Sequence, residues 1–363
     1  KKMKCFEEAV GLMYWDLRTG APKKSVKGRS EVIGVLSGEM FRMSVSDTMG
    51  EYLDILSQPE VFEELHPIDR KIVEECRKEY ERSKKIPPDK YQAYVVLTSE
   101  AESVWEEAKE TSDFKKFQPY LEKIVETNLE FIELWGYEGE KYNTLLDLYE
   151  PGMTVSQLNQ VFGELREKLV PLVAAIARSP HQPDTAFLHQ HFPKELQQQF
   201  NLYILGQMGY DFEAGRLDES VHPFATGLNL GDVRITTRYL PNDVGSALFG
   251  TIHEGGHALY EQNISPELAG TPLCTGTSMG IHESQSRFWE NIVGRSRPFW
   301  NRYYSELKKT FPGKFDNVTA EAFYRAINKV QPSLIRIEAD ELTYNLHIMI
   351  RYEIEKGLFE GSM

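Results

Sequence analysis

The chain has 363 residues, and its composition and charge exclude several classes of protein. Hydrophobic residues make up 41% of the sequence, which is enough for a sizeable core and too many for a disordered chain. The formal net charge of −14 argues against nucleic acid as a partner, because phosphate binding needs a basic surface. No stretch reaches the ~20 apolar residues that span a bilayer, so we expect no membrane partner.

The chain contains three cysteines, Cys5, Cys76 and Cys274, an odd number at wide and irregular spacing. They follow neither a disulfide framework nor a metal-ligand pattern, which favours a reduced, cytoplasmic location. The sequence opens at Lys1 without a signal-peptide core and runs directly into an amphipathic pattern. We therefore expect the natural start to lie further upstream.

Helical periodicity dominates the first half of the sequence. Apolar residues recur at three- and four-residue intervals over residues 91–108 and 117–135, and Gly136 is a plausible stop for the second helix. Thr154 and Gln157 form the sequence of a capping box before a further periodic stretch. These patterns predict a mainly α protein whose first half provides packing surfaces rather than chemistry.

Residues 224–239 break the helical pattern. This segment contains a β-branched and aromatic run that ends at Tyr239, and turn-forming residues from Asn229 to Asp232 precede the run. The combination predicts a small β-hairpin. The helical pattern resumes after Pro241 and carries the main motif.

Residues 253–257 read His-Glu-Gly-Gly-His. On a helix, positions i and i+4 share one face, so His253 and His257 can reach one metal ion. Glu254 is placed to act as the general base on a water bound to that ion. An ordinary helix with two exposed histidines is the alternative interpretation.

Gly255 and Gly256 lie inside the predicted helix. Each glycine there costs ~1 kcal/mol relative to alanine, so the pair indicates that something approaches the helix closely. Helix packing and the backbone of a substrate are both compatible with this pattern.

Two histidines leave a catalytic zinc site short of its usual third protein ligand. The continuation Ala258–Gln262 lacks the glycine and third histidine of a metzincin. Residues 281–291 offer Glu283 and Glu290 on a later helix, and we place Glu283 in its first turn, after Gly280. Spacing alone leaves both glutamates open as the third ligand.

Five motifs occur in order over about 120 residues: His222-Pro223-Phe224, Asp232-Val233-Arg234-Ile235-Thr236, His253 to His257, His282-Glu283-Ser284-Gln285, and Ile335-Arg336-Ile337-Glu338-Ala339-Asp340. In these motifs the chain resembles the carboxypeptidase Taq family of bacterial and archaeal metallocarboxypeptidases. Trp15-Asp16 and the helical lead-in are similar to the family as well, so the resemblance extends over the whole chain.

The resemblance implies Glu283 as the third ligand and one zinc or cobalt ion per chain. It also implies release of single amino acids from the C-termini of peptides, an almost entirely helical two-lobed zincin-like fold with a deep groove, and a homodimer. We therefore predict a single catalytic domain over residues 1–363, with a helical scaffold lobe at 1–210 and the metal-site region at 211–363.

The family's chains continue beyond the position of Met363 with a GxxQDxHW motif and a tyrosine-bearing segment. Related zinc peptidases use a histidine and a tyrosine from such a segment to stabilise the tetrahedral intermediate. We expect a chain that lacks them to bind zinc and to hydrolyse peptides very slowly, because each lost oxyanion donor costs ~10²–10³ in rate.

An exopeptidase must recognise a C-terminal carboxylate, and arginine does so through paired charge-assisted hydrogen bonds. Arg336 and Arg234 are the candidates within the family motifs. The alternative for Arg336 is a helical i,i+4 pair with Asp340. For Arg234 the alternative is a charge at the edge of the sheet, which discourages aggregation.

Several polar residues are candidates for supporting roles. Glu290 follows Glu283 on roughly the same helix face, which suits an outer-shell bond to His253 or His257. His282 and Asp340 are also predicted to lie around the ligands. His222 is a candidate for contact with the substrate, although a structural histidine would look the same in the sequence.

The sequence leaves two other functions open. An oligoendopeptidase would have the same metal site but no anchor for the substrate carboxylate. A helical interaction scaffold with a vestigial motif would bind no stoichiometric metal, and the intact Glu254 counts against it.

Overall fold

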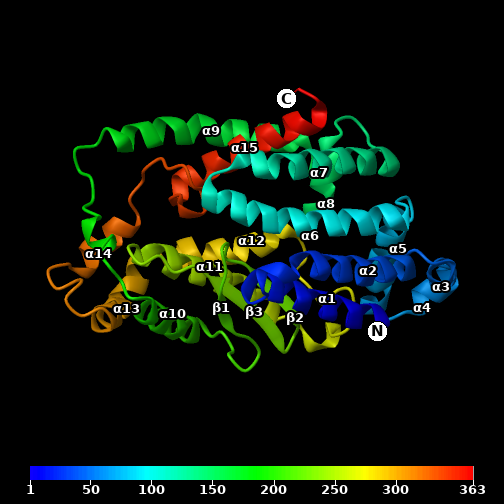
Figure 1. Ribbon diagram of the computed structural model, residues 1–363, viewed down its shortest axis with the longest axis horizontal. Helices are drawn as coiled ribbons and strands as arrows, with labels where there is room; N and C mark the ends of the chain where they lie inside the picture. Colours follow the sequence, from blue (N-terminus) through cyan, green and yellow to red (C-terminus); the bar gives the residue numbers. More distant parts are fainter. Residues whose placement is uncertain (363) are drawn as a thin grey trace. The chain divides into compact units, whose positions relative to one another are not determined.

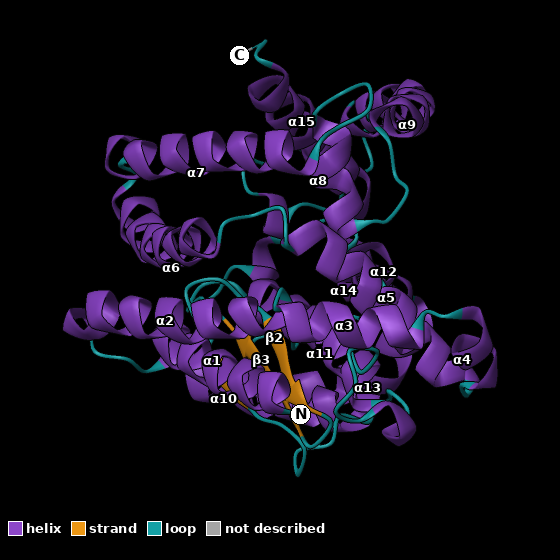
Figure 2. Ribbon diagram, turned by 90° about the vertical axis from the view of Figure 1, so that its right-hand side faces the viewer, coloured by secondary structure: helices purple, strands orange, loops and turns teal. Residues whose placement is uncertain are grey.

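The computed structural model describes residues 1–362 of the chain. The predicted mainly α class is confirmed, since helices make up most of the chain and the strands form one three-stranded sheet. The chain separates into two compact units. Figure 1 labels the elements along the sequence, and Figure 2 shows the helices in purple with the small sheet in orange.

The first unit comprises Lys1–Leu145, Leu228–Leu230 and Ile264–Thr275. Its helices are α1 (Lys2–Thr19), α2 (Val26–Ser44), α3 (Asp47–Leu56), α4 (Pro59–Glu64), α5 (Pro67–Ser83), α6 (Pro88–Thr111) and α7 (Phe114–Trp135), and α8 (Tyr142–Tyr149) crosses into the second unit. Helix α2 packs against α1 and α6, and α6 packs against α7. Gly34 allows α2 and α6 to approach each other closely, because a Cβ atom at this position would lie 2.4 Å from Val96 of α6.

The helices predicted from periodicity are present. The stretch at 91–108 lies within α6, and the stretch at 117–135 lies within α7. Helix α7 ends at Gly136, whose φ of +80° suits a residue without a side chain. The predicted capping box is also confirmed: Thr154 and Gln157 exchange hydrogen bonds at the start of α9.

The second unit comprises Leu146–Gly227, Gly231–Asn263 and Gly276–Met363, as far as it is described. Its helices are α9 (Val155–Ala177), α10 (Lys194–Met208), α11 (Val244–Gln262), α12 (Met279–Arg287), α13 (Arg297–Thr310), α14 (Ala320–Ile327) and α15 (Glu341–Glu360). A π-helical turn, η4 (Phe288–Val293), follows α12 without a break.

The small sheet has the strand order β1-β3-β2. Strands β2 (Ala225–Asn229) and β3 (Asp232–Thr237) are the two predicted arms of the hairpin. The sequence did not predict β1 (Leu217–Glu219), which runs parallel to β3 with Leu217 opposite Ile235. Since β1 has only three residues, it has too little alternation to give a periodic signal.

The core of the second unit fixes the position of α11. Six large aromatic side chains lie almost fully buried in it: Phe192, Phe200, Trp300, Phe311, Phe315 and Phe323. Buried hydrogen bonds also fix the alignment of α11 along its neighbours α10 and β3. Asn201 of α10 donates to the Ala247 carbonyl at 3.2 Å and to Thr251 Oγ1 at 2.9 Å, and Thr251 in turn donates to Thr237 of β3 at 3.0 Å. Helix α11 is therefore held from both sides.

A membrane-spanning helix is not found among the described residues, since none of their helices combines the length and the apolar character that crossing a bilayer demands.

Candidate metal centre

Helix α11 carries the His-Glu-Gly-Gly-His motif, and its start is well defined. Asp243 caps the helix by accepting hydrogen bonds from the backbone N–H groups of Gly245 at 2.7 Å and Ser246 at 3.0 Å. Leu248, Ile252 and other apolar residues of the helix are buried in the core. The packing orients the motif residues and leaves His253 and His257 half-buried.

The glycine pair allows two neighbouring helices to touch α11. A Cβ atom at Gly255 would lie 2.7 Å from Leu205 of α10, and one at Gly256 would lie 2.7 Å from the Cα of Ser286 in α12. Both values are shorter than real Cβ contacts. Close helix packing therefore accounts for both glycines, and through Gly256 it brings α12 against the motif.

Helix α12 begins earlier than the sequence analysis predicted. Ser278 caps it by accepting a hydrogen bond from Ile281 N at 3.2 Å, so Gly280 is already helical. Glu283 therefore lies one turn into the helix rather than in its first turn. The π-helical turn that follows contains Glu290, and such wide turns often occur at functional sites.

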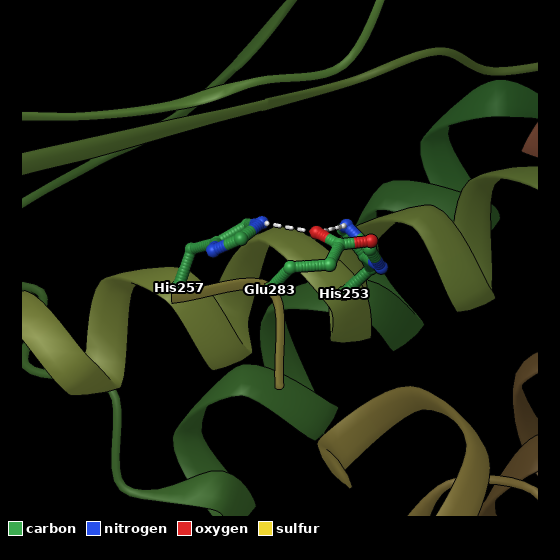
Figure 3. A group of neighbouring side chains, drawn as sticks. All are labelled: His253, His257 and Glu283. Carbon is green, nitrogen blue, oxygen red and sulfur yellow. Dashed lines mark ion pairs between the residues drawn. The ribbon is translucent and has the colours of Figure 1, made fainter. Parts of the chain in front are cut away.

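Three side chains converge between α11 and α12 (Figure 3). Glu283 Oε2 lies 3.5 Å from Nε2 of His253 and 3.3 Å from Nε2 of His257. A nitrogen of each histidine and a carboxylate oxygen of Glu283 all lie within 4.8 Å of one another. Of the two glutamates that spacing left open, Glu283 is the one in this group.

Glu290 lies on the other side of the His253 ring. His253 donates through Nδ1 to Glu290 Oε2 at 2.9 Å, which is the hydrogen bond expected between Glu290 and one of the histidines. Arg287 at 2.8 Å and Arg295 at 3.2 Å also donate to this carboxylate. Burial opposes the charge of Glu290, but the hydrogen bond from His253 and the nearby arginines outweigh it and lower its pKa to about 2.

His257 is held through a second histidine. Its Nδ1 lies 2.6 Å from Nδ1 of His282, and Nε2 of His282 lies 2.7 Å from Glu261 Oε1. Glu261 also accepts a hydrogen bond from Gly276 N at 3.3 Å. His282 thus lies beside His257 of the candidate group, and its contacts are with His257 and Glu261.

Tyr344 of α15 links Glu283 to Arg336. The Tyr344 hydroxyl donates to Glu283 Oε1 at 3.1 Å and accepts from Arg336 Nη1 at 2.7 Å. The Arg287 guanidinium lies 3.9 Å from the centre of the same ring. Glu283 therefore contacts both histidines with one oxygen and Tyr344 with the other.

The alternative interpretation of Arg336 as an i,i+4 partner of Asp340 is wrong. Arg336 lies in a short 3-10 turn, Arg336–Glu338, before α15 begins at Glu341. Asp340 is the N-cap of α15 and accepts from the backbone of Leu342 and Thr343. Ala339 and Asp340 both have extended backbone between the turn and α15, so Arg336 and Asp340 share no helical face.

The alternative interpretation of Arg234 as an edge charge is also wrong, because β3 is the central strand of the sheet. Arg234 makes a paired contact with Asp232, from Nε to Oδ1 at 2.7 Å and from Nη2 to Oδ2 at 2.7 Å. The paired N–H donors that would bind a substrate carboxylate are therefore already hydrogen-bonded to Asp232 on the same strand.

Two predicted site residues have contacts outside the His253–His257–Glu283 group. The side-chain hydrogen bonds of Asp340 hold the start of α15 and the backbone N–H of Gln331. His222 is half-buried, and its neighbour Pro223 lies 3.9 Å from the Cβ position of Gly250, one turn before His253 on α11. His222 therefore belongs to a segment that packs against the motif helix.

The charges at the centre depend on one another. Burial disfavours the charged form of His253, yet its hydrogen bonds to Glu283 and Glu290 raise its pKa to about 10. Burial lowers the pKa of His257. Burial also opposes charge on Glu283, but both histidines outweigh it and hold its pKa well below the ordinary value. Burial raises the pKa of Glu254 to about 7.

Glu261 and Tyr344 are not among the residues that the sequence predicts for the site. Glu261 lies four positions after His257, so the spacing that identified the histidines also places it on their helix face. Tyr344 gave no local signal, because it lies 61 positions after Glu283 and meets it only through packing.

The fold and the site together define a class of protein. A mainly helical chain with two histidines and a glutamate on one helix, and a carboxylate from the next helix, has the arrangement expected of an HExxH metallopeptidase. The family model described as carboxypeptidase Taq (M32) metallopeptidase matches residues 1–363. The chain belongs to this family, and the predicted function of metallocarboxypeptidase is confirmed at that level.

Individual relatives agree with the family assignment. The chain is 53% identical over its whole length to carboxypeptidase 1 of Bacillus subtilis and covers 72% of that protein. It is 42% identical to thermostable carboxypeptidase 1 of Thermus thermophilus, with 97% of this chain and 71% of the relative covered.

Solved structures show the same likeness in three dimensions. The BsuCP crystal structure matches with a TM-score of 0.98 at 53% identity, covering the whole of this chain and 72% of that one. A Pyrococcus furiosus carboxypeptidase matches with a TM-score of 0.90 at 36% identity, with the same shares covered. The fold observed for this chain is therefore that of its family.

Proposed function

We propose that the chain releases single amino acids from the C-termini of peptides with broad specificity, and that His253, His257 and Glu283 hold the divalent metal ion that this reaction needs. The observation that carries the proposal is the convergence of the three side chains within 4.8 Å. Membership of a family of metallopeptidases supports it as well.

The three side chains fit a zinc ion by distance and by chemistry. Zinc binds histidine nitrogen and carboxylate oxygen at ~2.0–2.2 Å, and tetrahedral geometry then separates neighbouring ligand atoms by about 3.3–3.5 Å. The two nitrogen–oxygen distances here are 3.3 Å and 3.5 Å. Once a metal ion displaces the proton of His253, two neutral imidazoles and one carboxylate form the donor set that suits zinc, and cobalt accepts the same set.

When bound, a divalent ion supplies a Lewis acid that polarises the scissile carbonyl and makes water more acidic. Glu254 acts as the general base: it takes a proton from the water that attacks the carbonyl carbon. As the C–N bond breaks, Glu254 passes that proton to the departing amine. The side chain is suited to this role because its backbone is fixed in α11 beside His253.

We assign recognition of the substrate's C-terminal carboxylate to Arg336. Its guanidinium is linked to Glu283 through Tyr344, which connects it to the metal-site residues. Arg234 is the weaker candidate because Asp232 occupies its paired donors. His222 is proposed to contact the substrate from the segment beside Gly250. Asp340 has the role of a helix cap in this scheme.

Other parts of the proposal rest on the sequence and the family. The metal is zinc or cobalt, one ion per chain. The active form is a homodimer, as the family resemblance implies, and a cytoplasmic location is in keeping with three widely spaced cysteines. Residues 1–363 act as one catalytic domain, with 1–210 as the scaffold and 211–363 as the metal-site region.

Glu254→Gln tests the chemistry most directly. In the complete protein, we expect this variant to bind as much zinc as the unaltered protein and to lose nearly all turnover, since the amide cannot accept the proton. Glu341→Gln, an exposed glutamate at the start of α15, is the matched control and should change neither quantity. Retained turnover in Glu254→Gln would mean that another group is the base.

A pair of peptides tests the exopeptidase assignment. A peptide with a C-terminal carboxylate should be cleaved, whereas its amidated twin should resist, because the amide lacks the charge that Arg336 recognises. Equal cleavage of both peptides would favour an oligoendopeptidase instead. A chain without stoichiometric metal would favour a non-catalytic scaffold.

A further inference from the structure

The contacts of His257 limit where its protons can lie. Metal binding through Nε2 requires a lone pair on that atom, so the ring's proton must be on Nδ1. Nδ1 of His257 lies 2.6 Å from Nδ1 of His282. Two protonated nitrogens cannot face each other at this distance, so Nδ1 of His282 must accept.

The other side of His282 determines whether it can accept. A neutral imidazole carries one proton, so a lone pair on Nδ1 of His282 requires the proton on Nε2. That atom lies 2.7 Å from Glu261 Oε1, and an ionised carboxylate can only accept a hydrogen bond. Glu261 therefore favours the arrangement of protons that leaves Nε2 of His257 open to a metal.

Glu261 is itself held in place. The backbone N–H of Gly276 donates to the same oxygen at 3.3 Å, and a Cβ atom at Gly276 would lie 2.4 Å from Cδ2 of His282. Gly276 thus allows its loop to contact both Glu261 and His282. Tyr260 packs against the His282 ring, with 5.1 Å between ring centroids.

We propose that Glu261 is a positioning residue for the metal site: acting through His282, it sets the tautomer of His257 and so the direction of its metal-binding lone pair. This inference rests on the proposed assignment of His257 as a metal ligand. Glu261 would be the fourth glutamate with a role at this site, after Glu254, Glu283 and Glu290, and it would act on the metal through His282 and His257.

Three variants separate this role from a purely structural one. Glu261→Met keeps the approximate size and removes the acceptor, so the affinity for Zn²⁺ should fall ~10- to 100-fold, as for other outer-shell partners. Glu261→Gln should restore most of the affinity, because Gly276 N–H and His282 Nε2–H both orient the amide oxygen towards His282. Tyr260→Phe, which keeps the ring and loses the hydroxyl contacts with Thr277 Oγ1 and the Thr277 backbone N–H, should bind zinc normally.

The affinity is measured on the full chain by competition with a chelator at neutral pH. Equal affinities for Glu261→Met and Tyr260→Phe would overturn the proposal, and so would equal losses in Glu261→Met and Glu261→Gln. Failure of the unaltered chain to bind zinc would instead overturn the proposed function.

Nitrogen NMR of the zinc-loaded, unaltered chain gives a second readout that needs no variant. His282 should carry its proton on Nε2 and a lone pair on Nδ1. The opposite assignment would overturn the proposal even if Glu261→Met failed to fold.

Discussion

Glu290 in the second unit and Glu102 in the first both lie near arginine, yet their protonation is shifted in opposite directions. Glu290 is 6% exposed and has hydrogen bonds from His253, Arg287 and Arg295, so its pKa falls to about 2 despite burial. Glu102 is half-buried, and burial together with the charge of Glu106 raises its pKa to about 7.

Arginine alone does not explain the difference. Arg18 lies 3.7 Å from Glu102 but 3.2 Å from Glu106, so its charge favours the other carboxylate. Glu290, by contrast, has direct donors on both oxygens. A buried carboxylate stays charged when hydrogen-bond donors contact it directly, as His253, Arg287 and Arg295 contact Glu290.

Replacing Glu290 should have the largest effect on stability. Glu290→Gln leaves the half-buried Arg287 and Arg295 without their counter-charge, which should cost about 3 kcal/mol in the free energy of unfolding. His253 also loses its carboxylate partner, so zinc affinity should fall ~10- to 100-fold. Urea unfolding of the metal-free chain and chelator competition measure the two effects. A free energy of unfolding within about 0.5 kcal/mol of that of the unaltered chain would contradict this account. Glu341→Gln is the control.

Removing the Tyr344 hydroxyl should have an intermediate effect. Tyr344→Phe loses the hydrogen bond to Glu283 Oε1 and the acceptor for Arg336, while the ring remains beneath Arg287. A hydrogen bond to a charged group contributes ~1.5 kcal/mol or more, so zinc affinity should fall about tenfold. An unchanged affinity in the chelator competition would show that Glu283 needs no support from α15.

Replacing Glu102 should have the smallest effect, and it should raise the stability of the folded state rather than lower it. Because its folded-state pKa is raised, the native state binds this proton more tightly than the unfolded chain, and the charged form is penalised as pH rises from about 4.5 to about 7. Glu102→Gln removes that penalty.

Thermal unfolding over a range of pH tests whether Glu102→Gln stabilises or destabilises the folded state. Above pH ~7 the Glu102→Gln variant should melt about 1–3 °C higher than the unaltered chain, allowing for solvent screening of the half-exposed group. Below pH ~4.5 the difference should vanish, because both side chains are then neutral. A lower melting temperature at high pH would mean that Arg18 stabilises the charged Glu102.

Features encoded locally could be predicted from the sequence. The periodicity and caps of α6, α7 and α9 depend on residues within a few positions of one another, and so does the spacing of His253 and His257. The choice of Glu283 over Glu290 could not be made from spacing. It depends on the packing of α12 against Gly256; spacing favoured Glu283 only weakly, and the family resemblance added the rest.

The wrong and missing predictions share a physical cause. The pairing of Arg336 with Asp340 assumed that the helix was continuous, whereas Asp340 caps it. The edge position of Arg234 assumed a two-stranded hairpin, whereas β1 adds a third strand beside β3. Tyr344 meets Glu283 across 61 positions, a contact that tertiary packing creates and local patterns do not reveal.

The metal content of three proteins tests the central claim that His253, His257 and Glu283 form one metal site. After exposure to Zn²⁺ and dialysis, elemental analysis should find about one zinc per chain in the unaltered protein and in Glu254→Gln, and far less in Glu283→Gln. The ligand variant should lose more affinity than the ~10- to 100-fold expected for outer-shell changes such as Glu290→Gln. Full zinc content in Glu283→Gln would contradict the assignment of the third ligand.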